Sequence, residues 1–449
     1  MKIIIIGGVA AGAKAAAKSK RMLPDAEIHI YTQDKFVSYS SCGIPYYIAG
    51  DFQDWRKLIV RSVEEFEKSG IHIHTEHRVN KILPNDKKIV VKKMDTEDNL
   101  FVAYDKLIIA TGSHPFIPNI KNYDLKNIFT LRNLQDGINI REQMLKSEHI
   151  TIIGGGYIAI ELVEGFVKNG KKVTLIEKSP FVLPVFDEEI SNLIQNYILE
   201  NSNGLVEIIN EDSVCEFIGK NEVHGVLTIK GSGIETDMVI ISTGVRPTID
   251  IAQDAGIQIG STGAIKVNSR MQTSISDIYA CGDCAEKYNI ISNTPVWVPL
   301  GSTANKEGRV AAINACGGVE DFEGILGSAV ARFHGLSMSM SGLTEKEAQK
   351  LGYDTVSIVT TKRDKAGYMP GVENVTIKLV ADRRSHKILG AQAIGSNDAD
   401  KKVNTVSVGL IRGMTVEDLL DVDLTYAPPF STSVDILITA ARTLKSKLN

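Results

Sequence analysis

A single cysteine stands in a segment whose composition suits a reactive thiol. Cys42 follows a predicted strand and is itself followed by Gly43 and Pro45. Proline is tolerated in the first turn of a helix, because the N–H that it lacks has no partner there, so a helix is predicted to begin just after Cys42. A thiol at a helix N-terminus lies in a positive potential, which favours the nucleophilic thiolate. A buried structural cysteine is the alternative, but the flanking Ser38 and Ser41 do not suit an apolar site, and the segment predicts a redox-active thiol.

A glycine-rich turn near the N-terminus is typical of a dinucleotide-binding unit. A predicted strand over residues 2–6 leads into Gly-Gly-Val-Ala-Ala-Gly at residues 7–12, and an alanine-rich helix is predicted over residues 10–22. Against the G-x-G-x-x-G pattern, the turn keeps the first and third glycines and has Val9 in the middle position. A second strand is predicted to end at Thr32, which occupies the place of the acidic residue that binds a ribose. The order of strand, turn and helix supports a nucleotide site here despite both departures.

A second unit of the same kind follows in the middle of the chain. A strand predicted over residues 150–153 runs into a complete G-x-G-x-x-A turn at residues 154–159, then a helix over residues 160–168 and a strand that ends at Glu177. This carboxylate suits the 2′-hydroxyl of an adenosine ribose and repels a 2′-phosphate. NADH is therefore favoured over NADPH, although the neighbouring Lys178 weakens the preference. A purely structural glycine turn is the weaker alternative, because every element of the unit is in order.

Two dinucleotide units in one chain indicate two dinucleotides, and a flavin with a nicotinamide is the economical pair. Three further predicted strands end in turns of small residues, at 110–112, 243–244 and 281–284. The last of these turns contains a Gly-Asp pair, whose carboxylate suits a hydroxyl of a sugar chain. These turns are consistent with two nucleotide-binding sheets.

The pattern changes from residue 326 onward. Alternating strands are predicted over residues 355–361, 375–381 and 388–394, followed by a helix over residues 401–412 and a final helix. The predicted fold class is α/β, with two doubly wound dinucleotide-binding domains followed by an α+β domain. The predicted boundaries are 1–115 with 245–325 for the FAD domain, 116–244 for the NAD(P) domain and 326–449 for the C-terminal domain.

The composition excludes several classes of partner. The 449 residues carry a net charge of -4, so neither a basic face for nucleic acid nor a polybasic patch for a membrane surface is expected. No apolar run reaches the roughly 18 residues of a membrane span, and the chain enters a strand at Lys2, which leaves no room for a signal peptide. Five scattered cysteines do not resemble the disulfide framework of a secreted protein, and a cytoplasmic location is predicted.

Two other groups have the residue types of a metal site but lack its other features. Cys281 and Cys284 form a C-x-x-C pair, but no second cysteine or histidine pair accompanies them, so a structural role is favoured. His72 and His74 alternate with isoleucines in a predicted strand, which places both on one solvated face, and His77 lies just beyond. No metal site is therefore predicted.

Taken together, these motifs resemble the flavoprotein pyridine nucleotide-disulfide oxidoreductases over nearly the whole chain. The similarity is greatest to the single-cysteine branch, which contains coenzyme A-disulfide reductase, NADH oxidase, NADH peroxidase and NADH-dependent persulfide reductase. The segment Ser38-x-x-x-Cys42-Gly-x-Pro45-Tyr46 carries the one redox cysteine of the coenzyme A-disulfide reductases, and no second cysteine follows it locally. The resemblance implies that the C-terminal α+β domain is a dimerisation domain and that the protein is a homodimer.

Positions within the branch favour a reductase over an oxidase. The oxidases and peroxidases carry a histidine in the first glycine turn, where this chain has Ala10. The coenzyme A-disulfide reductases have a Tyr-Ala-Pro-Pro segment whose tyrosine reaches the partner's active site, and Tyr426 matches it. Tyr368 matches a second tyrosine of that branch, although the other member of the pair is Met369 here. The resemblance implies catalytic roles for Cys42, Tyr426 and Tyr368.

The resemblance also assigns binding residues. For FAD they are Gly7, Gly8, Ala10, Ala11, Gly12, Thr32, Gln33, Ser41, Ala110, Thr111, Gly112, Gly282 and Asp283. For NADH they are Gly154, Gly155, Gly156, Tyr157, Ile158, Glu177 and Gly244. For coenzyme A, bound as a mixed disulfide to Cys42, they are Lys14, Lys18, Arg21, Ser38 and Ser41. The three basic residues are equally well explained as a solvated helix face, and both interpretations stay open.

The resemblance therefore predicts an FAD-dependent NAD(P)H:disulfide oxidoreductase, with coenzyme A-disulfide reductase as the first choice. Electrons would pass from NADH to FAD, to Cys42 and on to a coenzyme A mixed disulfide. The alternatives are an NADH oxidase that uses a Cys42 sulfenic acid, and an NADH-dependent persulfide or polysulfide reductase. In a different class, a flavin redox sensor or electron-transfer protein would leave the segments around Cys42 and Tyr426 unexplained.

Overall fold

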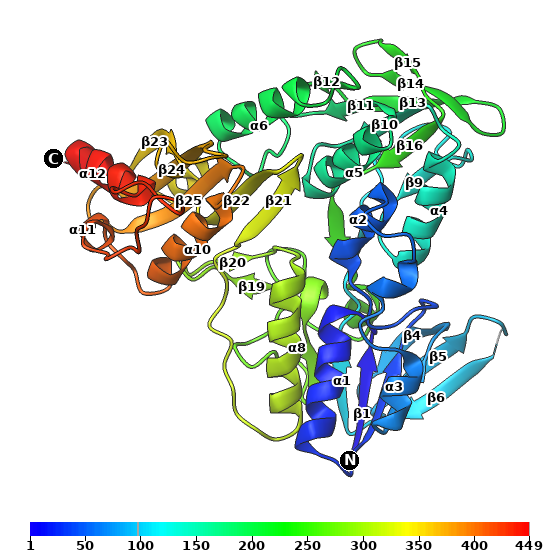
Figure 1. Cartoon of the computed structure of the whole chain (residues 1–449). Coiled ribbons are helices and arrows are strands. Elements are labelled where there is room, and N and C mark those ends of the chain that lie inside the picture. The colour runs from blue at the N-terminus through cyan, green and yellow to red at the C-terminus, as the bar shows by residue number, and fades with distance from the viewer. Residues whose placement is uncertain (97, 449) are drawn as a thin grey trace.

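The computed structural model describes residues 1–96 and 98–448, which form three lobes (Figure 1). Each lobe is built around one five-stranded sheet. The first lobe holds the N-terminus with β1 and α1, the second holds β10 and α5, and the third ends with α12. Within the described residues, no helix combines the length and the apolar character that a bilayer span requires.

The first lobe contains a parallel sheet in the order β18-β7-β1-β2-β3. Both faces of this sheet are covered, so β1 is a run of isoleucines with almost no exposed surface. Helices α1 and α8 pack against the sheet and each other, and an antiparallel sheet, β4-β5-β6, contributes Val79, Ile89 and Val91 to the same core. The bounds are β1 Lys2–Ile6, β2 Glu27–Tyr31, β3 Ile71–His74, β4 His77–Leu83, β5 Lys88–Lys93, β6 Asn99–Ala103, β7 Lys106–Ile109, β18 Ile278–Ala280, α1 Ala10–Met22 and α8 Gly301–Ala315.

The second lobe repeats the parallel arrangement in the order β12-β11-β10-β16-β9. Its helix after the glycine turn starts at Tyr157, earlier than the predicted residue 160, because the turn itself leads directly into the helix. The bounds are β9 Ile128–Thr130, β10 His149–Ile153, β11 Lys172–Glu177, β12 Val206–Asn210, β16 Met238–Ile241, α4 Leu134–Met144, α5 Tyr157–Lys168, α6 Glu188–Glu200, and an antiparallel sheet of β13 Val214–Gly219, β14 Val223–Thr228 and β15 Gly233–Glu235.

The third lobe is an antiparallel sheet in the order β21-β22-β25-β24-β23. Helices α10 and α12 pack on it and share one apolar core with β23, β24 and β25. The three strands predicted for this part of the chain correspond to β23, β24 and β25. The helix predicted over residues 401–412 is α10, which begins and ends two residues earlier. The bounds are β21 Ala329–Phe333, β22 Leu336–Gly342, β23 Thr355–Arg363, β24 Asn374–Asp382, β25 Ile388–Gly395, α9 Glu345–Lys350, α10 Ala399–Leu410, α11 Val416–Leu420 and α12 Ile436–Leu448.

The remaining elements are short, and two of them, η1 and η3, contain Cys42 and Asp283 of the candidate site. They are the 3-10 helices η1 Ser41–Gly43, η2 Trp55–Leu58 and η3 Gly282–Cys284, the helices α2 Ile44–Ala49, α3 Val63–Lys68 and α7 Asp250–Asp254, and the strands β8 Ser113–Pro115, β17 Val245–Pro247, β19 Lys287–Tyr288 and β20 Pro295–Val296.

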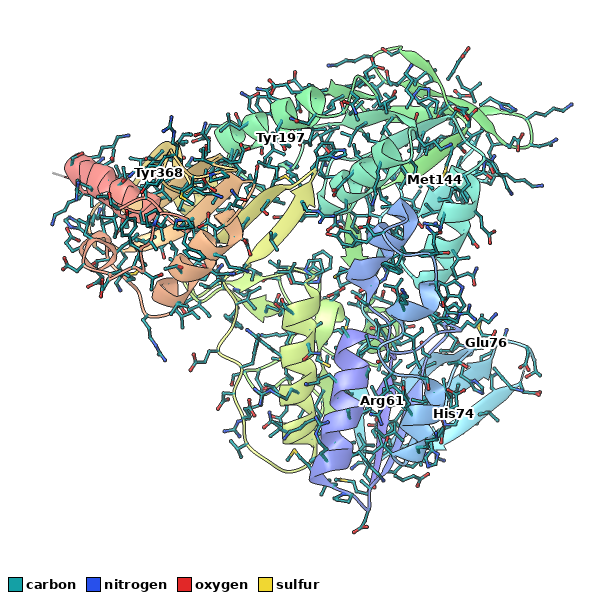
Figure 2. The ribbon with its side chains drawn as sticks, in the orientation of Figure 1. Arg61, His74, Glu76, Met144, Tyr197 and Tyr368 are labelled. Carbon is teal, nitrogen blue, oxygen red and sulfur yellow. The ribbon has the colours of Figure 1, made fainter. Side chains whose placement is uncertain are left out.

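Strands β2 and β3 carry a stack of rings. His72 is exposed, as the alternating pattern predicts, but His74 (Figure 2) is half-buried. Its ring stacks on Tyr31 with centroids 4.3 Å apart, and its Nε2 lies 2.9 Å from the Nδ1 of His29. Burial is the main cause that lowers the pKa of His74 to about 4. The predicted solvated face is therefore wrong for His74, because the parallel neighbour β2 places aromatic rings beside it.

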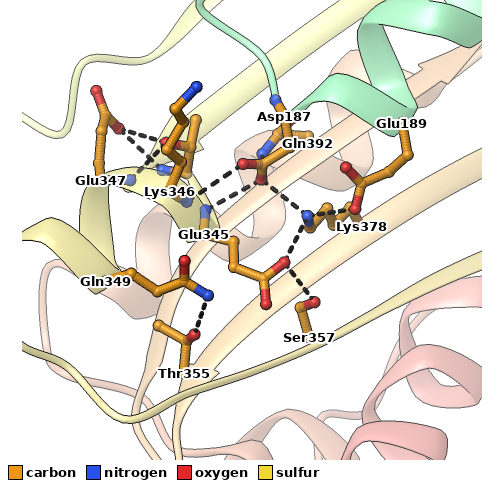
Figure 3. Close-up of polar contacts among 11 residues, drawn as sticks. Asp187, Glu189, Glu345, Lys346, Glu347, Gln349, Thr355, Ser357, Lys378 and Gln392 are labelled. Carbon is orange, nitrogen blue, oxygen red and sulfur yellow. Dashed lines mark hydrogen bonds and ion pairs between the residues drawn. The ribbon is translucent and has the colours of Figure 1, made fainter.

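A buried lysine joins the second lobe to the third (Figure 3). The Lys378 side chain, on β24, is 1% exposed, and its Nζ lies 3.1 Å from Asp187, 2.5 Å from Glu189 and 2.8 Å from Glu345. Asp187 and Glu189 come from the start of α6, and Glu345 comes from α9. Gln392 on β25 donates to Asp187 at 2.6 Å. Burial alone would lower the pKa of Lys378, but the surrounding carboxylates raise it. This network ties α6 to the third sheet.

Candidate active site

Cys42 lies in η1, immediately before α2, and its residue surface is exposed. Pro45 occupies the first turn of α2, as predicted. A Cβ added to Gly301 would lie 3.7 Å from the Cys42 Sγ, so the thiol faces the N-terminus of α8. The predicted helix start is thus confirmed, and a second helix that the sequence did not associate with Cys42 also begins beside it.

The pKa of Cys42 is raised from its ordinary value. Loss of water around the thiol is the main cause, the Glu161 carboxylate raises the pKa further, and a hydrogen bond with Ser41 acts in the opposite direction. The expectation of a thiolate favoured by a helix N-terminus is therefore wrong for the chain as described. Helix α2 has only six residues, and the two largest causes acting on the thiol, its desolvation and the Glu161 carboxylate, both raise the pKa.

No second thiol is available to Cys42. All five cysteines are free, and Cys281 and Cys284 are fully buried in the core of the first lobe. Cys316 follows the C-terminal end of α8, and Cys215 lies on β13 in the second lobe. A helix of 15 residues is about 22 Å long, so the N-terminus of α8 beside Cys42 is far from Cys316. Cys42 has to form any disulfide with a partner from outside the chain.

Sequence reasoning missed a carboxyl group near Cys42. Glu161 on α5 accepts a hydrogen bond from the Tyr46 hydroxyl at 3.2 Å, and the guanidinium of Arg332 lies 5.6 Å from the centroid of the Tyr46 ring. Burial is the main cause that raises the pKa of Glu161 to about 7, with Glu164 adding to it and Arg332 opposing it. The signal in the sequence was an acidic residue in the otherwise apolar start of a predicted helix.

Replacement of Glu161 by glutamine is expected to change the pH dependence of stability. The pKa of this carboxyl group is above its unfolded value of 4.5, so the folded state binds more protons between about pH 4.5 and 7. Its stabilising contribution is therefore complete below pH 4.5 and is lost as pH rises through 7. We expect Glu161→Gln to unfold at a higher temperature than the wild type at pH 8 but not at pH 5. Equal shifts at both pH values would contradict this explanation.

The first glycine turn is pressed between β1, β7 and α1. A Cβ at Gly7 would lie 2.1 Å from the carbonyl oxygen of Ala110, and one at Gly12 would lie 1.9 Å from the Gly7 carbonyl oxygen. Gly7 also has a φ of +105°. Helix α1 starts here without a side-chain cap, so its first N–H groups are free to bind an anion. A turn that excludes side chains at an uncapped helix N-terminus fits the diphosphate of a dinucleotide.

Residues at the ends of neighbouring strands surround this turn. The Thr111 hydroxyl donates to the carbonyl of Thr248 at 2.7 Å, and the Ser113 hydroxyl donates to Asp283 at 3.1 Å. Thr32 is buried and accepts the N–H of Asp34, whereas Gln33 is exposed. The predicted residues that the structure brings together here are Gly7, Gly8, Ala10, Ala11, Gly12, Thr32, Ala110, Thr111, Gly112, Gly282 and Asp283. Their role toward FAD stays a prediction.

The second glycine turn is shaped in the same way. A Cβ at Gly154 would lie 2.4 Å from the carbonyl oxygen of Ser242, at the end of β16. Glu177 is buried and accepts the N–H groups of Gly155 at 2.6 Å and Ser179 at 2.8 Å. Of the other predicted residues, Gly156 precedes α5, Tyr157 has a buried hydroxyl without a partner in the described chain, and Ile158 and Gly244 line one small cavity. The acidic side chain therefore lies at the turn, where a ribose is expected.

The choice of nicotinamide cofactor is expected to depend on Lys178, which is exposed next to Glu177. A 2′-phosphate near Glu177 requires a cation, and Lys178 is the adjacent one. We expect Lys178→Glu to lower kcat/KM for NADPH about tenfold and that for NADH less than threefold. Lys172→Glu, at the other end of β11, is the matched control. It is expected to leave kcat/KM unchanged for both NADPH and NADH. Equal losses with both cofactors would contradict a specificity role.

The residues predicted to contact coenzyme A lie on two segments. Lys14, Lys18 and Arg21 follow one side of α1 at helical spacing. Ser38 has a φ of +50°, and its N–H donates to the carbonyl of Gly8 at 2.7 Å, so the segment before Cys42 is attached to the first glycine turn. Ser41 adjoins Cys42 in η1. Ser38 and Ser41 thus lie at the candidate site, and the role of the three basic residues stays open.

The two predicted tyrosines lie together on the third lobe. The N–H of Ala366 donates to the carbonyl of Pro428 at 3.2 Å, which joins the segment of Tyr368 to that of Tyr426. Tyr368 (Figure 2) is 77% exposed, and Tyr426 is 51% exposed. Tyr426 lines a cavity of about 210 Å³ formed by residues 422–426, 431–435, 438 and 442, which does not include Cys42 of the same chain. Both side chains are thus available to a second subunit.

The chain shows no grouping of metal ligands in the part that the structure describes. Residues 1–96 and 98–448 contain no cluster of three or more histidine, cysteine or acidic side chains suited to an ion. The Cys284 thiol donates to the carbonyls of Ile109 and Cys281, at 3.5 and 3.3 Å. This C-x-x-C pair packs in the core, in agreement with the structural role expected for it.

Comparisons with known proteins agree with this architecture. A family model described as pyridine nucleotide-disulphide oxidoreductase matches residues 1–308, and one for the dimerisation domain of that family matches residues 328–437. The chain is 37% identical to an NAD(P)H coenzyme A polysulfide/persulfide reductase of Pyrococcus horikoshii, over 99% of this chain and 98% of that one. It is 29% identical to a coenzyme A disulfide reductase of Staphylococcus haemolyticus, over 97% of each.

A solved structure supports the same relationship. The NAD-dependent persulfide reductase from A. fulgidus superposes with a TM-score of 0.96 at 32% sequence identity. The match covers 100% of this chain and 83% of that one. The family models together span both the nucleotide-binding lobes and the third lobe. The chain therefore belongs to the pyridine nucleotide-disulphide oxidoreductases, flavoproteins that use FAD and NAD(P)H to reduce disulfide and sulfur compounds.

Proposed function

We propose that this protein uses NADH to reduce the sulfur–sulfur bond of coenzyme A disulfide through Cys42. The single observation that carries the proposal is the isolation of Cys42, which is exposed beside two helix N-termini while the other four cysteines lie elsewhere. A thiol without a protein partner has to exchange with a small thiol compound. The relative from Staphylococcus haemolyticus carries the name of this activity.

The chemistry divides between the cofactor and the chain. When bound, FAD supplies the transfer of two electrons from NADH toward sulfur. The Cys42 thiolate attacks one sulfur of coenzyme A disulfide, forming a mixed disulfide and releasing one coenzyme A thiolate. Two electrons and a proton then return the mixed disulfide to the Cys42 thiolate and a second coenzyme A thiol. The sum is NADH, one proton and one disulfide giving NAD⁺ and two thiols.

We infer that a second subunit completes the site. Tyr426 and Tyr368 are exposed on the lobe that matches the dimerisation-domain model, and the cavity of about 210 Å³ that Tyr426 lines does not include Cys42 of its own chain. A phenol from the partner subunit can donate a proton to the departing thiolate, which is a general-acid role. Helix α1, with Lys14, Lys18 and Arg21, offers cations to the phosphates of coenzyme A.

The intact mass of the native protein, with and without a thiol reductant, tests this proposal. A reductant-sensitive gain equal to coenzyme A on the Cys42 peptide is the expected result. Anaerobic oxidation of NADH on addition of coenzyme A disulfide, with no other protein present, is the expected activity. A bare Cys42 together with no anaerobic oxidation of NADH would contradict the proposal.

Reduction of a persulfide or polysulfide by the same thiol is the second candidate. The relatives from Pyrococcus horikoshii and A. fulgidus carry names of this kind, which favours it. The two candidates differ in the acceptor that gives the larger kcat/KM under anaerobic conditions. Ala10 stands where the oxidases carry a histidine, so oxygen reduction is expected to be slow by comparison.

A further inference from the structure

Two charged side chains are completely buried next to the predicted FAD site, and the activity proposed above makes no use of them. Lys287 on β19 and Glu307 on α8 have no exposed side-chain surface, and the Nζ lies 3.5 Å from the Glu307 Oε1. That Oε1 atom has no hydrogen-bond partner in the described chain. Burial is the main cause that raises the pKa of Glu307 to about 7. Because replacement of such pairs by apolar residues is often neutral or stabilising, stability alone is a weak reason for this one.

Both side chains bind the backbone of the same residue, Gly282. The N–H of Gly282 donates to the Glu307 Oε2 at 2.7 Å. The Lys287 Nζ donates to the carbonyls of Gly282 and Ala285, each at 2.9 Å. Glu307 therefore binds the N–H of Gly282, and Lys287 binds its carbonyl oxygen.

The bound glycine leaves no room for adjustment. Gly282 has a φ of +79°, and a Cβ there would lie 2.9 Å from the Cβ of Ala11 in the first turn of α1. Asp283 follows directly, with its carboxylate accepting from Ser113 and its carbonyl accepting from the Trp297 indole at 2.7 Å. The ion pair thus fixes the one turn that carries Asp283 against the uncapped start of α1.

We propose that Lys287 and Glu307 are positioning residues for FAD, which hold the backbone of Gly282 so that Asp283 meets the sugar chain of the cofactor. This inference rests on the assignment of the first glycine turn and Asp283 to FAD. The pair is completely buried beneath the turn and acts through its bonds to Gly282. If the pair positions the turn for FAD, its replacement weakens the binding of FAD. If the pair is purely structural, its replacement changes the folding stability and not the FAD affinity.

Release of FAD from the diluted holoenzyme, followed by flavin fluorescence, tests the proposal. The variant Lys287→Met/Glu307→Leu replaces both charges by apolar side chains of similar size and removes both side-chain hydrogen bonds to the backbone of Gly282. We expect its Kd for FAD to rise about tenfold or more, since hydrogen bonds to charged groups are strong. Glu307→Gln keeps an oxygen acceptor for the Gly282 N–H, and its Kd is expected to rise less than threefold.

A buried pair in the third lobe is the matched control. Lys402 and Asp435 lie 2.5 Å apart with side chains 13% and 7% exposed, and Lys402→Met/Asp435→Leu is expected to leave the FAD affinity unchanged. The proposal is overturned if the Lys287/Glu307 double variant keeps a Kd within twofold of the wild type. It is equally overturned if the control raises the Kd as much, or if Glu307→Gln loses FAD as strongly as the double variant.

Two further variants keep the test decisive. Should the double variant not fold, Lys287→Met alone, which leaves the Glu307–Gly282 bond in place, is expected to raise the Kd severalfold, and an unchanged Kd overturns the proposal. Asp283→Ala, which removes the acceptor altogether, tests the assignment on which the inference rests. If Asp283→Ala also leaves the Kd unchanged, the FAD site itself is wrongly placed, and the positioning role falls with it.

Discussion

Replacement of Cys42 by serine is expected to abolish the reduction of disulfide by NADH while leaving the reduction of the bound flavin by NADH intact. A hydroxyl forms no mixed disulfide, and the described chain offers no second thiol near η1. The loss in kcat/KM is expected to be on the order of a thousandfold or more. Stopped-flow spectroscopy measures the rate at which NADH reduces the bound flavin. Steady-state oxidation of NADH in the presence of coenzyme A disulfide measures the rate of the complete reaction.

Cys215→Ser is the matched control for this experiment. Cys215 is half-buried on β13 in the second lobe, and its thiol donates to the carbonyl of Leu227. A hydroxyl donates to a carbonyl at least as well, so Cys215→Ser is expected to keep full activity. Full activity of Cys42→Ser would refute the thiol mechanism, and loss of activity in both variants would point to instability instead.

The fold was readable from the sequence because its strongest patterns are local. The isoleucine run at residues 3–6 and the isoleucine-rich segment at 150–153 predict buried parallel strands. Each leads into a glycine turn whose close contacts leave no room for side chains. The helix predicted over residues 10–22 is α1 to the residue. Features that depend only on one strand and the next element along the chain could therefore be predicted from the sequence.

Features that depend on contacts between distant segments could not be predicted from the sequence. The raised pKa of Cys42 arises from the protein around it and from Glu161, which lies 119 residues further along the chain. The burial of His74 depends on rings of the neighbouring strand β2. Lys287 and Glu307 are ordinary surface residue types in the sequence, and only the tertiary fold buries them together. The hydrophobic periodicity of the sequence carries no information about such tertiary contacts, because the side chains involved belong to different elements.

Removal of the Lys378 ammonium is expected to destabilise the junction between the second and third lobes. In Lys378→Met the Asp187 carboxylate, 5% exposed, loses its cation, and Glu189 and Glu345 are left facing it with like charge. Breaking one side of a buried ion pair costs about 3 kcal/mol or more, because the remaining charge stays desolvated. For a chain of this length, a loss of that size corresponds to a fall in melting temperature of roughly 3 °C or more, and differential scanning calorimetry measures it.

Lys346→Met separates this effect from the mere loss of a lysine. Lys346 lies 3.7 Å from Glu188 with side chains 67% and 65% exposed, so water screens the pair and its loss is expected to cost under about 0.5 kcal/mol. Adding Asp187→Asn to Lys378→Met neutralises the most buried carboxylate and is expected to recover part of the lost stability. An equal melting temperature of Lys378→Met and the wild type would contradict this explanation. The three carboxylates would then take up protons at little cost, and packing rather than charge would hold α6 to the third sheet.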